Sequence, residues 1–377
     1  MKFLHTADWH IGRKLNGFSL LEEQSAAFQK MLAIADKEQV DAIVVAGDLY
    51  DRSVPSIEAV SLFNQMMIEM NIQKKYPVLA ISGNHDSATR LDTGSLWLKE
   101  LDFHLHTQLE QAFDPVEMEG IQFYLLPYFE PFHAREFFEN PDIKDIQQAM
   151  TFVIDKMKES IKPNMKQVLV SHFFVAGSLK SESETPVEVG GLDSVPMDLL
   201  KDFDYVALGH LHDKNAIKKV ETIQYSGALL KYSLSEEEQQ KGIRIIEITE
   251  NDFSNAFIPI EPLRDVKKLE GSFKVLTSPD FYNQIKRDDY FGVSLTDTSI
   301  IDNALHELRQ IYPHIISLER VNFEKRQQLK EDKIEQLVQL KPEQVLKSYF
   351  EEVTEKELTP RQMEWIEEAI LENRKEY

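Results

Sequence analysis

Short apolar runs alternate with helix-patterned segments through the first hundred residues, and this alternation restricts the fold more than any other feature. The clearest run is Ala42–Ala46, and similar runs occupy Lys2–Thr6 and residues 77–82. Amphipathic stretches at residues 21–37 and 56–71 separate them. Strands that are apolar along their whole length must be covered on both faces, so the pattern predicts an α/β fold with helices packed against a buried sheet.

The same pattern continues for another 150 residues. Helical periodicity returns at residues 91–101 and 142–161, and short alternating runs over residues 103–127 predict additional antiparallel strands. A second set of predicted strands covers residues 167–171, Tyr205–Gly209, Ile223–Tyr225, Gly242–Ile248 and residues 256–260. A polar stretch at residues 177–195 interrupts this set, and a loop of that length is usually functional or disordered.

The pattern changes near Pro262. Residues 265–322 read strand, helix, strand, helix, strand, which predicts a small separate α/β module. The chain beyond Glu324 is charged and helix-forming, with predicted helices at residues 342–353 and 360–374. We therefore expect a main domain at residues 1–262, a small domain at 263–324 and a helical C-terminal region at 325–377. Those helices either dock on their own domain or bind a partner.

Composition excludes several kinds of site. The chain has no cysteine, so it has no disulfide, no thiolate zinc site and no thiol nucleophile. It has no apolar run of the ~20 residues that span a bilayer and no signal-like start, which predicts a cytoplasmic protein without a membrane partner. A formal net charge of −22 argues against a broad nucleic-acid surface. Nucleic acid is still a possible substrate, because bound divalent cations reverse the field of an acidic site.

Clusters of Asp, Asn and His follow the predicted strands at their ends. They are Asp8-Trp9-His10, Gly47-Asp48, Gly83-Asn84-His85-Asp86, His172 and Gly209-His210-Leu211-His212. In an open α/β sheet the carboxyl ends of the strands share one edge, so these side chains are expected to meet. Imidazoles with oxygen ligands and no sulfur suit manganese, iron or zinc better than calcium. Asp48 is the natural bridge between two ions ~3.5–4 Å apart, the spacing of two-metal hydrolases.

The other histidines are not predicted to bind metal. His104-Leu105-His106 repeats the spacing of the last cluster, but it lies in an alternating strand with no preceding glycine. His5 lies inside the first strand and is predicted to be a hydrogen-bonded core residue. His133, His306 and His314 have no companions and are expected on the surface or in ordinary packing.

The ordered blocks Asp-x-His, Gly-Asp, Gly-Asn-His-Asp, an isolated His and Gly-His-x-His resemble the calcineurin-like metallophosphoesterase superfamily. Further blocks narrow the resemblance to the SbcD family of bacterial nucleases, at residues 6–12, 82–87, 181–184 with 190–191, 205–212 and 225–227. The match covers most of residues 1–250. It implies a two-sheet metallophosphoesterase sandwich flanked by helices, followed by a small α/β capping domain and a partner-binding helical tail.

The resemblance also implies two metal sites. Manganese is the expected metal, and magnesium is the alternative. One site would use Asp8, His10, Asp48 and His212. The other would use Asp48, Asn84, His172 and His210.

Four further residues take roles by the same resemblance. His85 would lie over the scissile phosphate as a proton donor or as a stabiliser of the transition state. Asp51 would orient that histidine. Arg52 and Arg90 are candidate phosphate contacts.

The implied activity is that of a metal-dependent DNA nuclease in repair, recombination and replication. It would degrade duplex ends as an exonuclease and cut single strands or hairpins as an endonuclease. An SbcC-type coiled-coil ATPase would be the partner, in an assembly of two copies of each chain. Deletion from Pro342 onward is expected to abolish that pairing. Homodimerisation through the nuclease domain is also implied, and the apolar residues of the helix at 57–70 are candidates for it: Val60, Phe63, Met66, Met67 and Met70.

Two other functions stay open at this point. A phosphomonoesterase or protein phosphatase of the same superfamily is the first, because Gly47-Asp48-x-x-Asp51-Arg52 resembles the protein-phosphatase block. A scaffold that recruits an ATPase through its C-terminal helices is the second. The complete set of ligand residues argues against a purely structural role.

Overall fold

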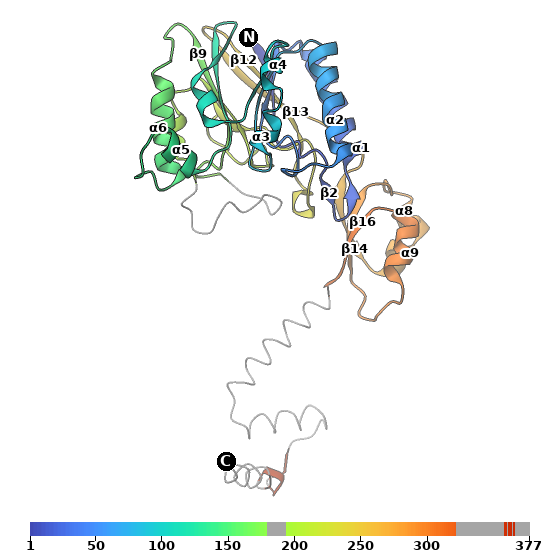
Figure 1. Ribbon diagram of the computed structural model, residues 1–377. Coiled ribbons are helices and arrows are strands. Elements are labelled where there is room, and N and C mark those ends of the chain that lie inside the picture. The colour runs from blue at the N-terminus through green and yellow to red at the C-terminus, as the bar shows by residue number, and fades with distance from the viewer. Residues whose placement is uncertain (179–193, 322–357, 360, 364, 366–377) are drawn as a thin grey trace.

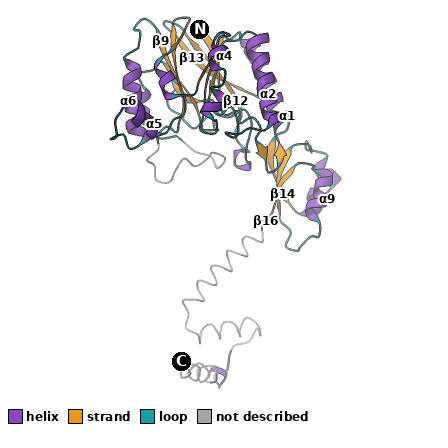
Figure 2. Ribbon diagram, viewed as in Figure 1, coloured by secondary structure: helices purple, strands orange, loops and turns teal. Residues whose placement is uncertain are grey.

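The computed structural model describes residues 1–178, 194–321, 358–359, 361–363 and 365. Two sheets pack face to face in this part of the chain, and helices cover the outer face of each (Figures 1 and 2). The first sheet has the strand order β13-β12-β1-β4-β5-β6 and the second β11-β10-β9-β8-β7. The predicted α/β sandwich with flanking helices is therefore confirmed.

The first sheet has a parallel half and an antiparallel half. The parallel strands are β1 (Lys2–Thr6), β4 (Ala42–Ala46), β5 (Val78–Ile81) and β6 (Phe103–His106). The antiparallel strands are β12 (Gly242–Ile248) and β13 (Phe253–Pro259). Its outer face is covered by α1 (Leu21–Glu38) and α2 (Ile57–Met67), which continues as a π-helical segment, Ile68–Gln73. A two-stranded hairpin, β2 (Lys14–Leu15) and β3 (Phe18–Ser19), follows β1.

The second sheet is parallel except for one edge. Its strands are β7 (Val116–Met118), β8 (Ile121–Leu126), β9 (Lys166–His172), β10 (Tyr205–Gly209) and β11 (Ile223–Tyr225), with only β7 antiparallel to its neighbour. Its outer face is covered by α5 (Pro131–Phe137) and α6 (Ile146–Lys158). Three short 3₁₀ turns complete this part: η2 (Leu109–Phe113), η3 (Met197–Leu200) and η4 (Leu234–Glu236).

Strand β4 shows why the central strands are apolar along their whole length. Ala42, Val44 and Ala46 belong to the core between the two sheets. Ile43 and Val45 belong to the core between the first sheet and its helices. Because successive strand side chains point to opposite faces, a strand between two cores must be apolar at every position.

One local prediction was wrong, and another was confirmed only in part. The helix expected over residues 91–101 is instead two short helices, α3 (Ala88–Leu91) and α4 (Ser95–Lys99), and the second begins directly after Gly94, whose φ of 85° is left-handed. Only β7 and β8 form an antiparallel pair within residues 103–127. Strand β6 lies parallel to β5, because a helical connection separates them and allows the chain to cross over.

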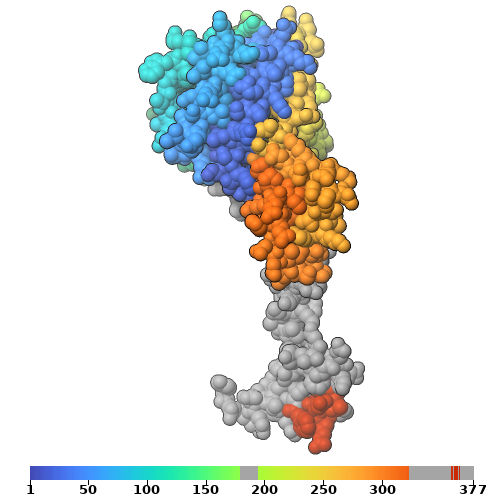
Figure 3. Space-filling model, turned by 90° about the vertical axis from the view of Figure 1, so that its right-hand side faces the viewer, coloured from blue at the N-terminus to red at the C-terminus, as the bar shows by residue number. Residues whose placement is uncertain are grey.

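A third sheet forms a smaller module with its own apolar core. Its parallel strands are β14 (Val266–Gly271), β15 (Tyr290–Leu295) and β16 (Ile315–Arg320), and its helices are α7 (Phe273–Leu276), α8 (Pro279–Tyr282) and α9 (Ala304–Ile311). The module packs against the N-terminal part of the chain (Figure 3). The Tyr290 hydroxyl donates to Glu23 (2.8 Å), and the Asn16 amide donates to the Ile316 carbonyl (2.8 Å).

The helices predicted at residues 342–353 and 360–374 lie outside the described residues, apart from a few positions near 360. The same holds for the family-like stretches at residues 181–184 and 190–191. In the part of the chain that is described, no helix has the length and apolar character needed to cross a bilayer.

Candidate metal centre

The polar clusters of both sheets meet at the carboxyl ends of the strands. Asp8 and His10 follow β1, Asp48 follows β4 and Asn84 follows β5. The second sheet contributes His172 at the end of β9, and His210 and His212 after β10. Six of these seven side chains are buried, with at most 6% of their surface exposed, and Asn84 is half-buried. The structure therefore brings all seven predicted ligands to one place between the two sheets.

One group of ligands contains Asp8, His10 and His212, whose ligand atoms all lie within 4.8 Å of one another. The Nε2 atoms of His10 and His212 face each other at 3.2 Å. The Asp8 carboxylate also accepts the backbone N–H of His210 at 3.0 Å, which holds the β1 and β10 ends together. These three residues belong to the set predicted for the first metal site.

A second group lies around Asn84 and Asp48. The Asn84 Oδ1 lies 3.0 Å from both His172 Nε2 and His210 Nδ1. The Asp48 Oδ2 lies 3.3 Å from His172 Nε2 and 3.6 Å from His10 Nε2, so this one oxygen touches both groups. A carboxylate in that position can reach a cation held by either group.

The backbone is strained at several of these residues. Asp8, His10, Asp48 and His210 have φ values of 52°, 44°, 51° and 99°, in the region that L-residues rarely occupy. Strain of this kind persists only where surrounding contacts impose it, and it clusters at functional sites. Here the loops are tied to each other, because the N–H groups of Asp8 and His10 donate to the carbonyls of Gly47 and Asp48 at 3.1 and 2.9 Å.

Glycines next to the ligands allow the two sheets to approach closely. A Cβ atom at Gly209 would lie 1.8 Å from the Ala46 carbonyl oxygen and 2.7 Å from His172 Nδ1. A Cβ atom at Gly83 would lie 2.2 Å from Asp48 Oδ1. All three distances are below van der Waals contact, so any larger residue would push the ligands apart.

The protonation states suit a cation. Burial lowers the pKa of His10 well below its usual value, so its ring is neutral and can offer a lone pair. Burial alone would raise the pKa of Asp48, but the neighbouring His172 and His10 rings hold it far below its usual range. Burial would lower the pKa of His172, yet the Asp48 carboxylate raises it to about 9. The site thus favours a positive charge between Asp48 and His172.

The two ring nitrogens of the buried His10 have different surroundings. Its Nδ1 has no hydrogen-bond partner among the described residues and lies 3.9 Å from the Asp51 carboxylate. Its other nitrogen faces His212 Nε2, and two imidazole nitrogens at that distance are both satisfied when they share a cation. The residues present therefore fit divalent metal ions, with nitrogen and oxygen ligands of the kind that Mn²⁺, Fe²⁺ and Zn²⁺ accept.

His85 lies beside the cluster. Its ring centre is 4.7 Å from that of His10, its backbone N–H donates to Asp48 Oδ1 at 2.9 Å, and its Nδ1 lies 2.9 Å from the Asp51 carbonyl oxygen. That carbonyl, rather than the carboxylate predicted from the resemblance, accepts from the His85 ring. This hydrogen bond fixes the orientation of the His85 ring. With Nδ1 used in this bond, Nε2 is the ring nitrogen left to contact a substrate.

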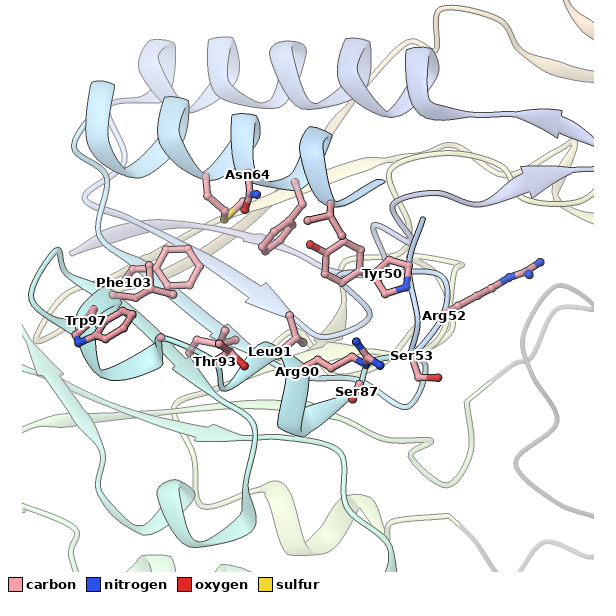
Figure 4. A pocket seen from close by; sticks show the side chains of 17 residues that line it. Tyr50, Arg52, Ser53, Asn64, Ser87, Arg90, Leu91, Thr93, Trp97 and Phe103 are labelled. Atoms are coloured by element: carbon pink, nitrogen blue, oxygen red, sulfur yellow. The ribbon is translucent and has the colours of Figure 1, made fainter. Parts of the chain in front are cut away.

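The Asp51 carboxylate contacts two arginines, and it also forms a group of possible metal ligands with His10 and His85, with Oδ1 3.9 Å from His10 Nδ1. It lies 3.2 Å from the Arg13 guanidinium and 3.5 Å from that of Arg52. Arg52 and Arg90 both line a cavity of about 480 Å³ between α2 and the α3–α4 segment, with Trp97 and Phe103 at the end opposite to Arg52 (Figure 4). The Arg52 side chain is 77% exposed and points away from the cavity.

Three residues near the site were not singled out by sequence reasoning. The Asp86 carboxylate accepts three backbone N–H groups from the loops after β4 and β5. The Glu236 carboxylate lies 3.4 Å from His212 Nδ1, and Arg13 stacks over the Tyr232 ring at 4.9 Å. Asp86 stands within the Gly-Asn-His-Asp block, so its position was a signal, whereas no local pattern marks Glu236 or Arg13.

The histidines set aside from the sequence lie away from the ligand groups. His5 is buried, with Nδ1 2.9 Å from the Tyr205 hydroxyl and Nε2 3.2 Å from the Leu208 carbonyl. His106 contacts the Leu125 carbonyl, and neither it nor His104 belongs to a group of metal-ligand type among the described residues.

Known proteins are similar in sequence to this chain over most of its length. Residues 1–214 match the family model of the calcineurin-like phosphoesterases, and residues 262–354 match that of the type 5 capsule protein repressor C-terminal domain. The SbcD subunit of the nuclease SbcCD from Staphylococcus epidermidis is 36% identical over 371 residues, covering 98% of each chain. That of Staphylococcus saprophyticus is 36% identical over 376 residues, covering 99% of each. A dimetal phosphatase from Danio rerio superimposes with a TM-score of 0.45 and 12% identity, over 70% of this chain and 98% of its own.

Proposed function

This chain belongs to the calcineurin-like phosphoesterase family, in its SbcD branch, and we propose that it is a metal-dependent DNA nuclease that acts with an SbcC-type ATPase. The observation that carries the proposal is the convergence of the seven predicted ligand side chains, among which Asp48 Oδ2 lies 3.6 Å from His10 Nε2 and 3.3 Å from His172 Nε2. The proposed reactions are exonucleolytic cleavage of duplex ends and endonucleolytic cleavage of single strands and hairpins, in DNA repair and recombination.

The seven ligands would hold two divalent ions, Mn²⁺ ahead of Mg²⁺. The first site is formed by Asp8, His10, Asp48 and His212, and the second by Asp48, Asn84, His172 and His210. When bound, such ions supply hydroxide at neutral pH and neutralise the charge that builds on a phosphoryl oxygen. The buried ligands and the strained loops keep the donor atoms in place without reorganisation, which is the main contribution of the protein to this chemistry.

His85 is the proposed catalytic side chain that contacts substrate. Its Nδ1 is occupied by the Asp51 carbonyl, so Nε2 is the atom that would donate a proton to the leaving oxygen or stabilise the transition state. Asp51 then acts through its backbone and through its contact with Arg13. Arg52 and Arg90 remain candidate contacts to DNA phosphates on the side of the cavity between α2 and α4.

The main competing function is that of a phosphomonoesterase or protein phosphatase. The relatives at 36% identity are named nucleases and match nearly the whole chain, which favours the nuclease. Assays of p-nitrophenyl phosphate and linear duplex DNA in parallel separate the two functions. Strong turnover of p-nitrophenyl phosphate without DNA cleavage would favour the phosphatase and refute the proposal.

Replacement of His85 tests the mechanism. The His85→Asn variant should keep its bound metal and lose DNA cleavage by about 10²–10⁴-fold, the usual contribution of a general acid. His306→Asn, an exposed histidine of the third sheet's module, is the matched control and should cleave like the wild type. Metal content by atomic emission is measured on the same samples. A His85 variant with full activity would exclude this role.

An exposed apolar surface supports homodimerisation through the nuclease domain. Of the residues predicted for it, Phe63, Met66 and Met70 are buried in the core, whereas Val60 stays exposed. Other exposed apolar side chains enlarge the surface on α2 and α4: Ile57, Leu96 and Trp97. Val60 and Trp97 line the same cavity, and exposed apolar side chains that lie together are typical of an interface. Light scattering should find a dimer that Leu96→Glu converts to monomer, and an unchanged mass would contradict it.

Pairing with the ATPase is proposed to use the chain from Pro342 onward, of which the structure describes only a few positions near residue 360. The proposed complex contains two copies of each chain. Truncation before Pro342 should abolish co-purification with the ATPase while the metal content of the nuclease domain stays unchanged. Recovery of the ATPase with the truncated chain would refute this assignment. The cytoplasmic location expected from the sequence stays a prediction.

A further inference from the structure

A buried carboxylate contacts one metal-site histidine at the ring nitrogen that faces away from the other ligands. Glu236, at the end of η4, is fully buried, and its Oε1 lies 3.4 Å from His212 Nδ1. The opposite nitrogen of the same ring, Nε2, faces His10 Nε2 at 3.2 Å. Glu236 thus lies behind His212, on the side opposite to the proposed metal position.

A buried ammonium group keeps this carboxylate ionised. The Nζ of Lys241 forms an ion pair with Glu236 Oε2 and donates to the His212 carbonyl oxygen at 2.9 Å. Both charged side chains are more than 90% buried, so each needs the other as its counter-charge. Glu236 Oε1 also accepts the Tyr232 backbone N–H at 3.3 Å.

The charge state of Glu236 decides the tautomer of His212. An ionised carboxylate only accepts hydrogen bonds, so the His212 nitrogen that faces it must carry a proton. With the proton on Nδ1, the lone pair of a neutral imidazole lies on Nε2, the atom that faces His10. Histidines that bind metals through one nitrogen commonly donate the other N–H to a carboxylate, which raises the basicity of the ring and fixes its orientation.

The surrounding turn limits the alternatives for the ring. The Tyr232 ring packs edge-on against both His212 and His10, with centroid distances of 5.4 and 5.3 Å. The Tyr232 hydroxyl donates to the Trp9 carbonyl at 2.6 Å, which holds this aromatic side chain against the loop of His10. Packing therefore confines the ring of His212, and the carboxylate selects which nitrogen it presents.

We propose that Glu236 is a positioning residue, which acts through His212 to present Nε2 to the first metal ion, with Lys241 maintaining its charge. The proposal rests on the metal-binding function proposed above. It adds to that function a residue 24 positions away from the ligand it controls, outside all the ligand clusters.

Titration calorimetry with Mn²⁺ on the metal-stripped full chain tests this role. Glu236→Gln removes the charge and introduces an amide that can donate as well as accept, so the side chain no longer requires a proton on His212 Nδ1. The change should weaken one of the two binding events by about 10–100-fold, the usual effect of altering such a partner. The matched control is Glu238→Gln, an identical change at an exposed position in the same segment, which should bind like the wild type. Equal affinities for Glu236→Gln and wild type would overturn the proposal.

A second variant separates positioning from folding. Glu236→Gln leaves Lys241 buried without its counter-charge, so a loss of metal affinity could follow from unfolding alone. The double variant Glu236→Gln/Lys241→Gln removes both charges and should recover the thermal midpoint while its Mn²⁺ affinity stays low. Recovery of both properties would assign Glu236 a purely structural role and refute the proposal.

A measurement on the wild type does not depend on any variant folding. Nitrogen-15 spectra of histidine-labelled, zinc-loaded protein should show the His212 proton on Nδ1. A proton on Nε2 would overturn the proposal. Failure of the underlying function is distinguishable, because the wild type would then bind no Mn²⁺ or would bind it without cleaving DNA.

Discussion

The Asp86 carboxylate joins the two loops that carry Asp48 and Asn84, and its replacement should weaken the fold and the site together. Oδ1 accepts the N–H of Tyr50 at 2.9 Å, and Oδ2 accepts the N–H groups of Leu49 at 3.0 Å and Gly83 at 2.9 Å. Asp86→Asn keeps the shape of the side chain but turns one oxygen into a donor. That donor must then face at least one backbone N–H.

The three hydrogen bonds set the expected magnitude. The single side-chain oxygen that remains in the Asp86→Asn variant would keep two bonds at most, and a bond to a charged acceptor contributes about 1.5–3 kcal/mol. One such bond is lost, and the new amide N–H₂ group faces a backbone N–H group, so that two donors oppose each other. Together these effects should lower the free energy of unfolding by about 2–4 kcal/mol. Burial raises the pKa of Asp86 to about 7, so the comparison belongs at a pH of about 8.5, where the wild-type carboxyl is ionised.

Urea denaturation of the metal-free chain, followed by circular dichroism, measures this difference. The control is Asp155→Asn, on the exposed side of α6, which should change the unfolding free energy by less than about 0.5 kcal/mol. The affinity for Mn²⁺ should also fall in the Asp86 variant, because both loops lose a shared anchor. An Asp86 variant as stable as the wild type would refute the hydrogen-bond argument.

Three further outcomes are expected. Removal of metal with a chelator should lower the thermal midpoint of unfolding. Mn²⁺ at about 100 times its Kd should restore about 2.7 kcal/mol of unfolding free energy per site, which calorimetry can measure. An unchanged thermal midpoint would contradict metal binding to the folded chain. Gly209→Ala should cost at least about 2 kcal/mol of unfolding free energy, because its Cβ would lie 1.8 Å from the Ala46 oxygen, and an unchanged urea midpoint would contradict this. Burial and the nearby Arg244 lower the pKa of His5 to about 3 in the folded chain. Between about pH 6.5 and pH 3 the unfolded chain therefore binds more protons than the folded chain does. The free energy of unfolding falls as the pH falls through that window. From about pH 7 to pH 4, the wild type should therefore lose up to about 3 kcal/mol more than His5→Gln, and parallel pH profiles would contradict the assignment.

The strand pattern and most of the ligand set could be predicted from the sequence because both are local. An apolar run such as Ala42–Ala46 shows burial on two faces whatever it packs against. A polar cluster directly after such a run must lie at the carboxyl end of the strand. Asp8, Asp48 and Asn84 could therefore be placed at one edge without knowledge of their neighbours.

Strand direction was harder to predict where the local signal was weak. The alternating burial of β6 is compatible with either direction, and only its connection to β5 and its place at the sheet edge make it parallel. The break at Gly94 belongs to the same class, since glycine within a helical pattern is compatible with a continuous helix. In both cases tertiary packing selected one of two locally acceptable structures.

The sequence alone determined the class of fold, the types of ligand and the strand ends at which they lie. These follow from side-chain chemistry and from the alternation of side chains between the two faces of a strand. Only the tertiary structure decided which atoms meet. It placed the Asp51 carbonyl, and not its carboxylate, on His85, and it brought Glu236 behind His212. Those contacts depend on how two sheets and a distant turn pack together, and no local pattern encodes the distance between residues that are far apart in the chain.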